Sequence, residues 1–119
     1  MTTPALSLYG LKNCDTCRKA ISALEDAGYG VTFIDIRTEA DLPRLVPVWL
    51  EALGPTALVN KRSTTWRGLS PEEQSAAQGD GASDALIANP TLIKRPIIES
   101  GTLHTVGWTS KTIAAYPQI

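Results

Sequence analysis

Alternating and helically spaced hydrophobic positions define the first third of the chain. Residues 6–9 alternate as a short strand, and apolar positions then recur at helical spacing from Cys17 to Ala27. Residues 31–36 alternate again, which indicates a second strand. Asn13 is a possible helix cap, and Gly28 is a helix stop signal. Strand, helix and strand in this order predict a βαβ unit.

The middle of the chain has helical patterns and no convincing strand pattern. Asp41 marks a helix start, and the apolar face that follows ends at Gly54. Pro47 is expected to lie in the first turn of this helix or to kink it. Ser70, followed by Pro-Glu-Glu, is a capping signature that opens another short helix. Residues 39–90 are therefore predicted to form an all-helical insertion.

Strand patterns return near the end of the chain. Residues 96–99 and 103–107 are predicted to form a hairpin around Gly101, because a tight turn of this kind favours glycine. Residues 109–115 are predicted to form a last short helix. Two strands first and a hairpin last predict an α/β fold with a four-stranded mixed sheet.

Composition and charge limit the function classes. The chain has 119 residues, 43% hydrophobic and 19% charged, which suits one globular domain. Its formal net charge of -1 offers no basic footprint for nucleic acid or an anionic membrane. There is no apolar run of bilayer length and no signal segment at the N-terminus. We expect a cytoplasmic monomer that binds neither nucleic acid nor membrane.

Cys14 and Cys17 are the only cysteines, and two residues separate them. A structural disulfide stabilises most when it closes a long loop, so this spacing contributes little as a crosslink. A zinc site needs further ligands, and His104 is the only other candidate of that kind, so no metal is expected. The spacing favours a redox-active pair. The alternative is two small, half-buried apolar residues that happen to be cysteines.

The predicted helix assigns different roles to the two sulfurs. Cys14 lies at the helix start, where unpaired N–H groups and the helix dipole favour an anion. Lys12 and Arg18 add positive charge beside it, whereas Asp15 acts in the opposite direction. These features predict a lowered pKa for Cys14. Cys17 lies one turn further into the helix, so it is expected to be less exposed and to resolve a mixed disulfide formed on Cys14.

Three segments carry a resemblance to a known family. They are Asn-Cys-Asp-Thr-Cys-Arg-Lys-Ala at 13–20, Asn-Lys-Arg-Ser-Thr-Thr-Trp-Arg at 60–67 and Ile-Lys-Arg-Pro-Ile at 93–97. With these motifs the chain resembles the arsenate reductase ArsC/Spx family, and within it most closely the YffB-type proteins. The resemblance implies a thioredoxin-like (glutaredoxin-like) fold in which residues 1–38 and 91–119 carry the sheet and residues 39–90 are the insertion.

The resemblance also implies roles for individual residues. Cys14 matches the nucleophilic cysteine of the arsenate reductases, and Arg62 and Arg95 match arginines of the anion site beside it. Pro96 matches a proline with a cis peptide bond that faces the cysteine motif. The simpler alternatives are surface solvation for the arginines and an edge-strand start for Pro96. The expected catalytic set is Cys14, Cys17, Arg62 and Arg95. The expected substrate-binding positions are Lys12, Asn13, Arg18, Arg95 and Pro96.

Two departures from the arsenate reductases change the expected substrate. A third arginine that follows the last hairpin in those enzymes has no counterpart near residues 103–107, and Cys17 stands where they carry serine. The resemblance therefore implies a thiol–disulfide oxidoreductase with glutathione as co-substrate and no bound cofactor. The alternative is an Spx-like redox-sensing regulator that binds RNA polymerase. His104 is interpreted as structural or solvated rather than as a proton donor.

Overall fold

The computed structural model describes residues 4–119, which fall into two compact units. One unit comprises the chain up to Glu39 together with Arg95–Ile119, and the other comprises Ala40–Lys94. The expectation of no signal segment at the N-terminus falls partly on residues 1–3, which lie outside the described residues.

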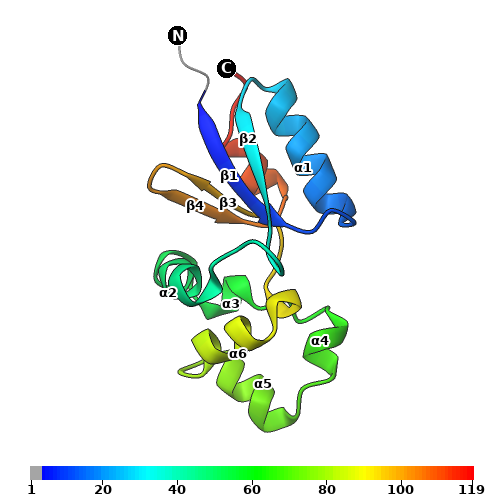
Figure 1. Ribbon diagram of the computed structural model, residues 1–119, viewed down its shortest axis with the longest axis vertical. Helices are drawn as coiled ribbons and strands as arrows, with labels where there is room; N and C mark the ends of the chain where they lie inside the picture. Colours follow the sequence, from blue (N-terminus) through cyan, green and yellow to red (C-terminus); the bar gives the residue numbers. More distant parts are fainter. Residues whose placement is uncertain (1–3) are drawn as a thin grey trace. The chain divides into compact units, whose positions relative to one another are not determined.

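The first unit is built on a four-stranded mixed sheet (Figure 1). Its strands are β1 (Ala5–Gly10), β2 (Gly30–Asp35), β3 (Ile97–Ser100) and β4 (Leu103–Val106), and its helices are α1 (Asp15–Asp26) and α7 (Ser110–Ala114). The strand order is β2-β1-β3-β4, with β1 and β2 parallel and the other neighbouring pairs antiparallel. The predicted βαβ unit, hairpin and mixed sheet are confirmed.

One face of this sheet carries the hydrophobic core of the unit. Alternate residues of β1 and β3 point toward α1 and the segment after α7, because successive strand residues face opposite sides. The buried members of this cluster are Leu6, Leu8, Cys17, Ala20, Leu24, Ile98 and Tyr116. Cys17 is therefore one of the core side chains that hold α1 on the sheet.

Local hydrogen bonds secure the ends of the elements in this unit. Gly101 has a φ of 59°, which explains why glycine forms the turn between β3 and β4. The C-terminal segment lies against the loop after α1: the Tyr29 hydroxyl donates to the Pro117 carbonyl at 2.8 Å, and the Ile119 N–H donates to the Ala27 carbonyl at 2.9 Å.

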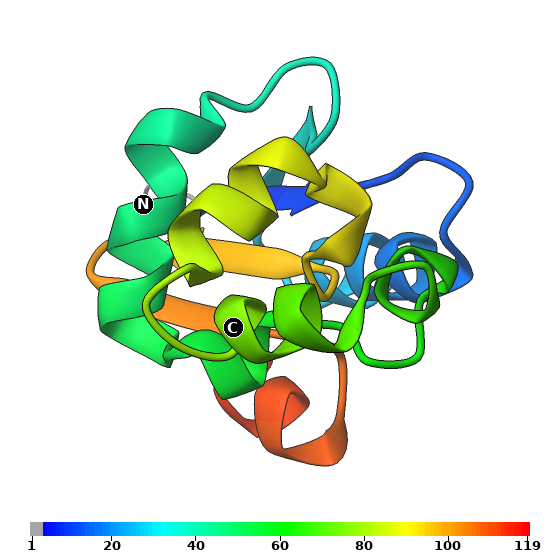
Figure 2. The same ribbon diagram turned by 90° about the horizontal axis from the view of Figure 1, so that it is seen from below.

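The second unit is helical, as the sequence predicts (Figure 2). Its helices are α2 (Leu42–Leu53), α3 (Pro55–Leu58), α4 (Thr64–Arg67), α5 (Pro71–Ala77) and α6 (Ala82–Ala88), followed by the short 3-10 helix η1 (Pro90–Leu92). Helix α6 packs against α2 and α5. A single antiparallel bridge joins Val59 to Ile93. The short helices α3 and α4 were not predicted from the sequence.

Two helix features of this unit test the sequence interpretation. Ser70 and Glu73 form the predicted capping box: the Glu73 N–H donates to the Ser70 hydroxyl at 3.1 Å, and the Ser70 N–H donates to the Glu73 carboxylate at 2.8 Å. Pro47 lies inside α2 rather than in its first turn, where Pro43 lies instead.

Candidate active site

The loop after β1 brings Cys14 to the start of α1. The Cys14 N–H donates to the Leu11 carbonyl at 3.2 Å, and the Cys14 carbonyl accepts the Arg18 N–H at 3.0 Å. Cys14 has the extended backbone of an N-cap residue, with φ -96° and ψ 116°. The expectation that Asn13 caps the helix is therefore wrong, because the chain enters α1 one residue later. The sulfur that was predicted to react belongs to the capping residue itself.

The surroundings of Cys14 favour its thiolate. Partial burial acts to raise the pKa of Cys14, but the backbone N–H of Cys17, hydrogen bonds from the Cys17 thiol and the Arg95 side chain, and the Arg95 charge together lower it. Hydrogen-bond donors and a cation stabilise the charged form of the sulfur. Because the net shift is downward, their combined effect exceeds the cost of removing the sulfur from water. The lowered pKa predicted for Cys14 is thus found, although its causes extend beyond the helix start.

The surroundings of Cys17 have the opposite effect. Its side chain is fully buried. Burial, together with the neighbouring Cys14, raises the pKa of Cys17 to about 12, even though the Leu11 backbone and the Arg95 charge act to lower it. At neutral pH this thiol therefore keeps its proton and can donate a hydrogen bond to Cys14. The difference between the two sulfurs fits the roles of attacking and resolving cysteine that the helix positions predict.

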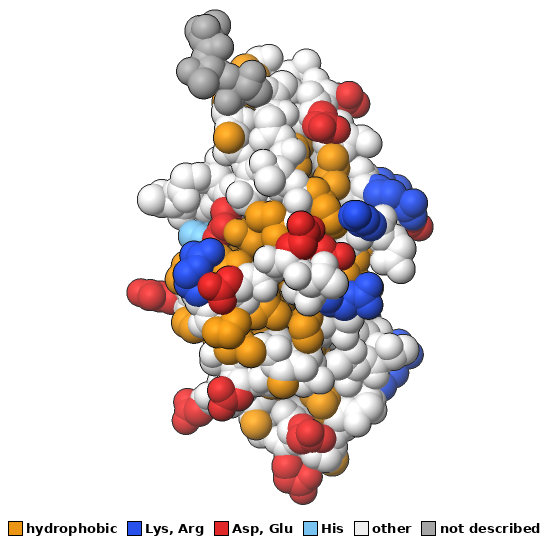
Figure 3. Space-filling view, viewed as in Figure 1, with side chains coloured by type: hydrophobic (Ala, Val, Ile, Leu, Met, Phe, Trp, Pro, Cys, Tyr) orange, Lys and Arg blue, Asp and Glu red, His pale blue; other side chains and the backbone are white. Residues whose placement is uncertain are grey.

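The positive charge that acts on Cys14 comes from a distant part of the sequence. The sequence favoured Lys12 and Arg18, and Figure 3 shows Lys and Arg side chains gathered around the start of α1. Arg18 forms an exposed ion pair with Asp15 at 2.5 Å, so the charges of these two side chains largely offset each other. The cation whose charge and hydrogen bond lower the Cys14 pKa is Arg95, which precedes β3.

Arg95 is joined to Pro96 by a cis peptide bond, as the family resemblance implies. Pro96 is fully buried, and its carbonyl accepts the Gly107 N–H at 2.9 Å. It precedes β3, which lies between β1 and β4, so the alternative reading of Pro96 as an edge-strand start is wrong. Arg95 and Pro96 belong to the same unit as the cysteines.

Arg62 belongs to the helical unit, in the loop before α4. Its N–H donates to the Asn60 side-chain oxygen at 3.1 Å, and its carbonyl accepts a hydrogen bond from the Arg67 side chain at 3.0 Å. Its side chain is exposed. The role of Arg62 at an anion site stays a prediction, as do the substrate-binding roles of Lys12, Asn13 and Arg18.

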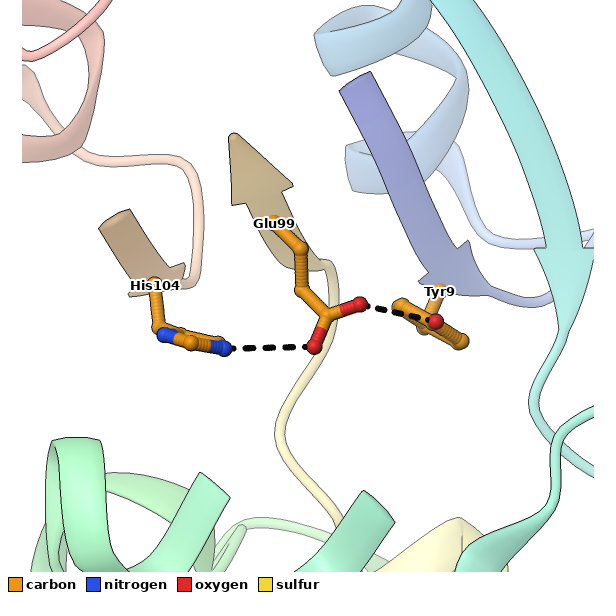
Figure 4. A network of polar contacts seen from close by, with 3 residues as sticks. All are labelled: Tyr9, Glu99 and His104. Carbon is orange, nitrogen blue, oxygen red and sulfur yellow. Dashed lines mark hydrogen bonds and ion pairs between the residues drawn. The ribbon is translucent and has the colours of Figure 1, made fainter. Parts of the chain in front are cut away.

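A network of polar side chains lies on the sheet face opposite α1 (Figure 4). The Glu99 carboxylate accepts the Tyr9 hydroxyl at 2.8 Å and lies 3.2 Å from the His104 ring nitrogen. His104 is only 14% exposed, so it is held by a carboxylate rather than solvated. Glu99 was not among the residues predicted from the sequence to lie at a site. The hairpin register carried a signal, because residues 99 and 104 face each other across the turn.

Within residues 4–119, no three His, Cys, Asp or Glu side chains are grouped so that they could bind a metal ion. Over the same residues, no helix combines the length and the apolar character that crossing a bilayer requires. The cysteine pair with Arg95 is the candidate active site, because it combines a thiol of lowered pKa, a buried second thiol and a cation that acts on both.

Comparisons with known proteins agree with this geometry. A protein from Haemophilus influenzae, described only as uncharacterized, is 39% identical over 111 residues, which is 92% of this chain and 96% of that protein. The solved structure of a YffB protein is 30% identical, with a TM-score of 0.81 and coverage of 94% and 98% of the two chains. An arsenate reductase (ArsC) related protein from Brucella melitensis is 31% identical, with a TM-score of 0.77 and coverage of 98% and 97%. The ArsC family model matches residues 9–116, and the chain belongs to the ArsC family.

Proposed function

We propose that this protein is a thiol–disulfide oxidoreductase in which Cys14 attacks a disulfide and glutathione serves as co-substrate. Membership of the ArsC family supports a thiol oxidoreductase-like role, as does likeness to a protein described as related to arsenate reductase. The proposed attack of Cys14 on a disulfide rests on the chemistry of the two cysteines.

The observation that carries the proposal is the opposite effect of the site on its two sulfurs. The Cys14 pKa is lowered, whereas that of Cys17 is raised to about 12. A thiolate is the attacking form in thiol–disulfide exchange, and a protonated neighbour can release its proton when it attacks the mixed disulfide that results. A pair of structural cysteines gains nothing from such a difference.

In the first step, the Cys14 thiolate attacks the glutathione sulfur of a mixed disulfide between glutathione and a substrate thiol. The substrate S–S bond breaks, a new S–S bond joins Cys14 to glutathione, and the substrate leaves as a thiolate that takes up a proton from solvent. The substrate sulfur is reduced, and Cys14 is oxidised to the mixed disulfide.

In the second step, one of two thiols restores Cys14. A glutathione thiolate can attack the bound glutathione sulfur, which yields oxidised glutathione and the free Cys14 thiolate. Alternatively, Cys17 attacks the Cys14 sulfur, gives up its proton to the departing glutathione, and leaves a Cys14–Cys17 disulfide that two further glutathione molecules reduce. In both routes glutathione supplies the two electrons that reduce the substrate disulfide, and it leaves as oxidised glutathione.

A thiol substrate is favoured over arsenate for reasons of sequence. Residues 103–107 carry no arginine to match the third arginine of the arsenate reductases, and Cys17 supplies a second thiol where those enzymes have serine. Arg95 contributes to the proposal by stabilising the thiolate, since a guanidinium combines a fixed charge with several donors.

The test is reduction of a glutathione mixed disulfide by the wild type, Cys14→Ser and Cys17→Ser. We expect Cys14→Ser to abolish turnover, because no other cysteine has a lowered pKa. We expect Cys17→Ser to keep activity if free glutathione resolves the intermediate, and to lose it if Cys17 does.

Measuring each variant with and without glutathione separates these routes. If Cys14→Ser keeps the activity of the wild type, Cys14 is not the nucleophile. Activity that does not depend on glutathione concentration would leave the thiol chemistry intact but exclude glutathione as the reductant.

A further inference from the structure

Gly10 ends β1 and lies directly against the resolving cysteine. A Cβ atom built at this position would overlap the Cys17 sulfur and would lie 3.3 Å from the Cys17 Cβ. The positive-φ glycines among the described residues are Gly28, Gly54, Gly101 and Gly107, so the backbone of Gly10 does not itself demand glycine. What requires glycine at this position is the space that the sulfur occupies.

Neither backbone at this contact is free to move away. Gly10 pairs with Asp35 of β2, and its carbonyl accepts the Ile36 N–H at 2.9 Å. On the helix side, Ala20 and Leu24 of α1 are buried in the same cluster as Cys17. Because close-packed elements resist displacement, an added methyl group at residue 10 would be accommodated by the Cys17 side chain.

The Cys17 side chain has one rotatable bond, so it can yield only by turning its sulfur away. That movement would break its hydrogen bond with Cys14 and increase the separation of the two sulfurs. We propose that Gly10 is a positioning residue that holds the Cys17 sulfur within reach of Cys14. The inference rests on the proposed function, since it concerns the resolving step of the same site.

In that step the Cys17 sulfur attacks the Cys14 sulfur of a mixed disulfide. The bond between Cys14 and the departing thiol breaks, the Cys14–Cys17 bond forms, and the proton of Cys17 leaves with the departing thiol or to solvent. The first step needs only Cys14 and an incoming disulfide. Gly10 is thus expected to act on the second step and not on the first.

The experiment uses the aromatic disulfide dithiobis(nitrobenzoate) with the full chain. Attack by Cys14 releases one thionitrobenzoate, and attack by Cys17 on the resulting mixed disulfide releases a second in a unimolecular phase. In Gly10→Ala we expect the first phase to keep its full amplitude and the second to slow by at least about tenfold, since small displacements of reacting groups are costly. Gly68→Ala is the matched control, because its Cβ would lie 3.6 Å from the nearest atoms.

A second phase of unchanged rate in Gly10→Ala would overturn the inference while leaving the function in place. Absence of the first phase in the wild type would instead contradict the proposed function, because Cys14 would then not attack a disulfide. The two failures are therefore distinguishable, because they concern different phases of the reaction and different proteins.

A double variant covers the case in which Gly10→Ala does not fold. Cys17→Ala removes the sulfur that the new methyl group would meet, so thermal stability should be lowered by Gly10→Ala in the wild-type background and much less in the Cys17→Ala background. Equal losses in the two backgrounds, or failure of both Gly10 variants to fold, would show that the sulfur is not the reason for glycine at this position.

Discussion

At the scale of single residues, the two cysteines differ because one sulfur lies at the start of α1 and the other lies inside the core. Cys14 is partly exposed, and its sulfur accepts hydrogen bonds from the N–H and thiol of Cys17 and from the Arg95 side chain. Cys17 is fully buried. Burial disfavours a charged sulfur, and donors favour one. The same four-residue segment therefore provides one thiol with a lowered pKa and one with a raised pKa.

Removing the Arg95 charge should raise the pKa of Cys14. We expect Arg95→Met to slow alkylation of Cys14 by iodoacetamide several-fold at slightly acidic pH, because less thiolate is present there. Arg18→Met is the matched control: Arg18 is engaged by Asp15, so its loss should change the rate much less. Equal effects of the two substitutions would contradict the assignment of Arg95 as the stabilising cation.

Cys17 should make the reduced protein less stable at alkaline pH. Its pKa is raised from 9.0 to about 12, so between these values the unfolded chain releases a proton that the folded chain keeps. The free energy of unfolding should therefore fall by up to about 1.4 kcal/mol per pH unit over this range, and the contribution is fully present below pH 9.

The measurement is the free energy of unfolding in urea as a function of pH, for Cys14→Ser and for Cys14→Ser/Cys17→Ala, so that Cys14 does not contribute to either curve. The double variant should lack the part of the alkaline decrease in this free energy that Cys17 causes. Burial, the largest cause of the raised pKa, remains in Cys14→Ser, whereas the contribution of Cys14 is removed. Identical slopes in the two proteins would mean that burial does not raise the pKa of the Cys17 thiol.

At the scale of elements, α5 shows how local hydrogen bonds define a helix of only seven residues. Ser70 and Glu73 satisfy each other's backbone N–H groups at its start. Ser70→Ala should lower the free energy of unfolding by about 1 kcal/mol, because it leaves a helix N–H without its acceptor. Ser75→Ala, at an exposed position of the same helix, should have little effect. Chemical denaturation of both variants tests this, and similar values for the two would contradict it.

The sheet face opposite α1 offers a second test at this scale. Tyr9 is buried, and its hydroxyl donates to the Glu99 carboxylate at 2.8 Å. Tyr9→Phe should cost about 1.5 kcal/mol, since hydrogen bonds to charged groups contribute more than neutral ones. Tyr29→Phe, which removes an exposed hydrogen bond to the Pro117 carbonyl, should cost less. Thermal unfolding of both variants measures the difference, and a larger loss for Tyr29→Phe would refute this ranking.

At the scale of the whole molecule, the sequence patterns predicted the mixed sheet and the helical insertion because long elements have clear periods. Helices α3 and α4 were missed, since four residues are too few to show a 3.6-residue period. The helical pattern of residues 39–90 indicated the insertion, whereas the bounds of the helical unit at Ala40 and Lys94 rest on tertiary contacts that no local pattern contains.

The residues of the candidate site that lie close together in the sequence were predictable from it, and those contributed by distant segments were not. The CxxC spacing and the helix start indicated Cys14 and Cys17. The sequence indicated Lys12 and Arg18 as nearby cations but did not reveal that Arg18 pairs with Asp15, because that pairing depends on side-chain geometry. Arg95 lies far along the chain, and only the family resemblance pointed to it. The role proposed for Gly10 needed the packing of β1 against α1.

The central claim is that the site lowers the pKa of Cys14 and raises that of Cys17. The most direct measurement is an ultraviolet titration of thiolate absorbance in the reduced wild type, with Cys14→Ser and Cys17→Ser as controls. The account predicts one thiol that ionises below its ordinary pKa, and this transition should be absent in Cys14→Ser. A Cys14 that titrates at or above the value of a free thiol, or an early transition that survives Cys14→Ser, would contradict it.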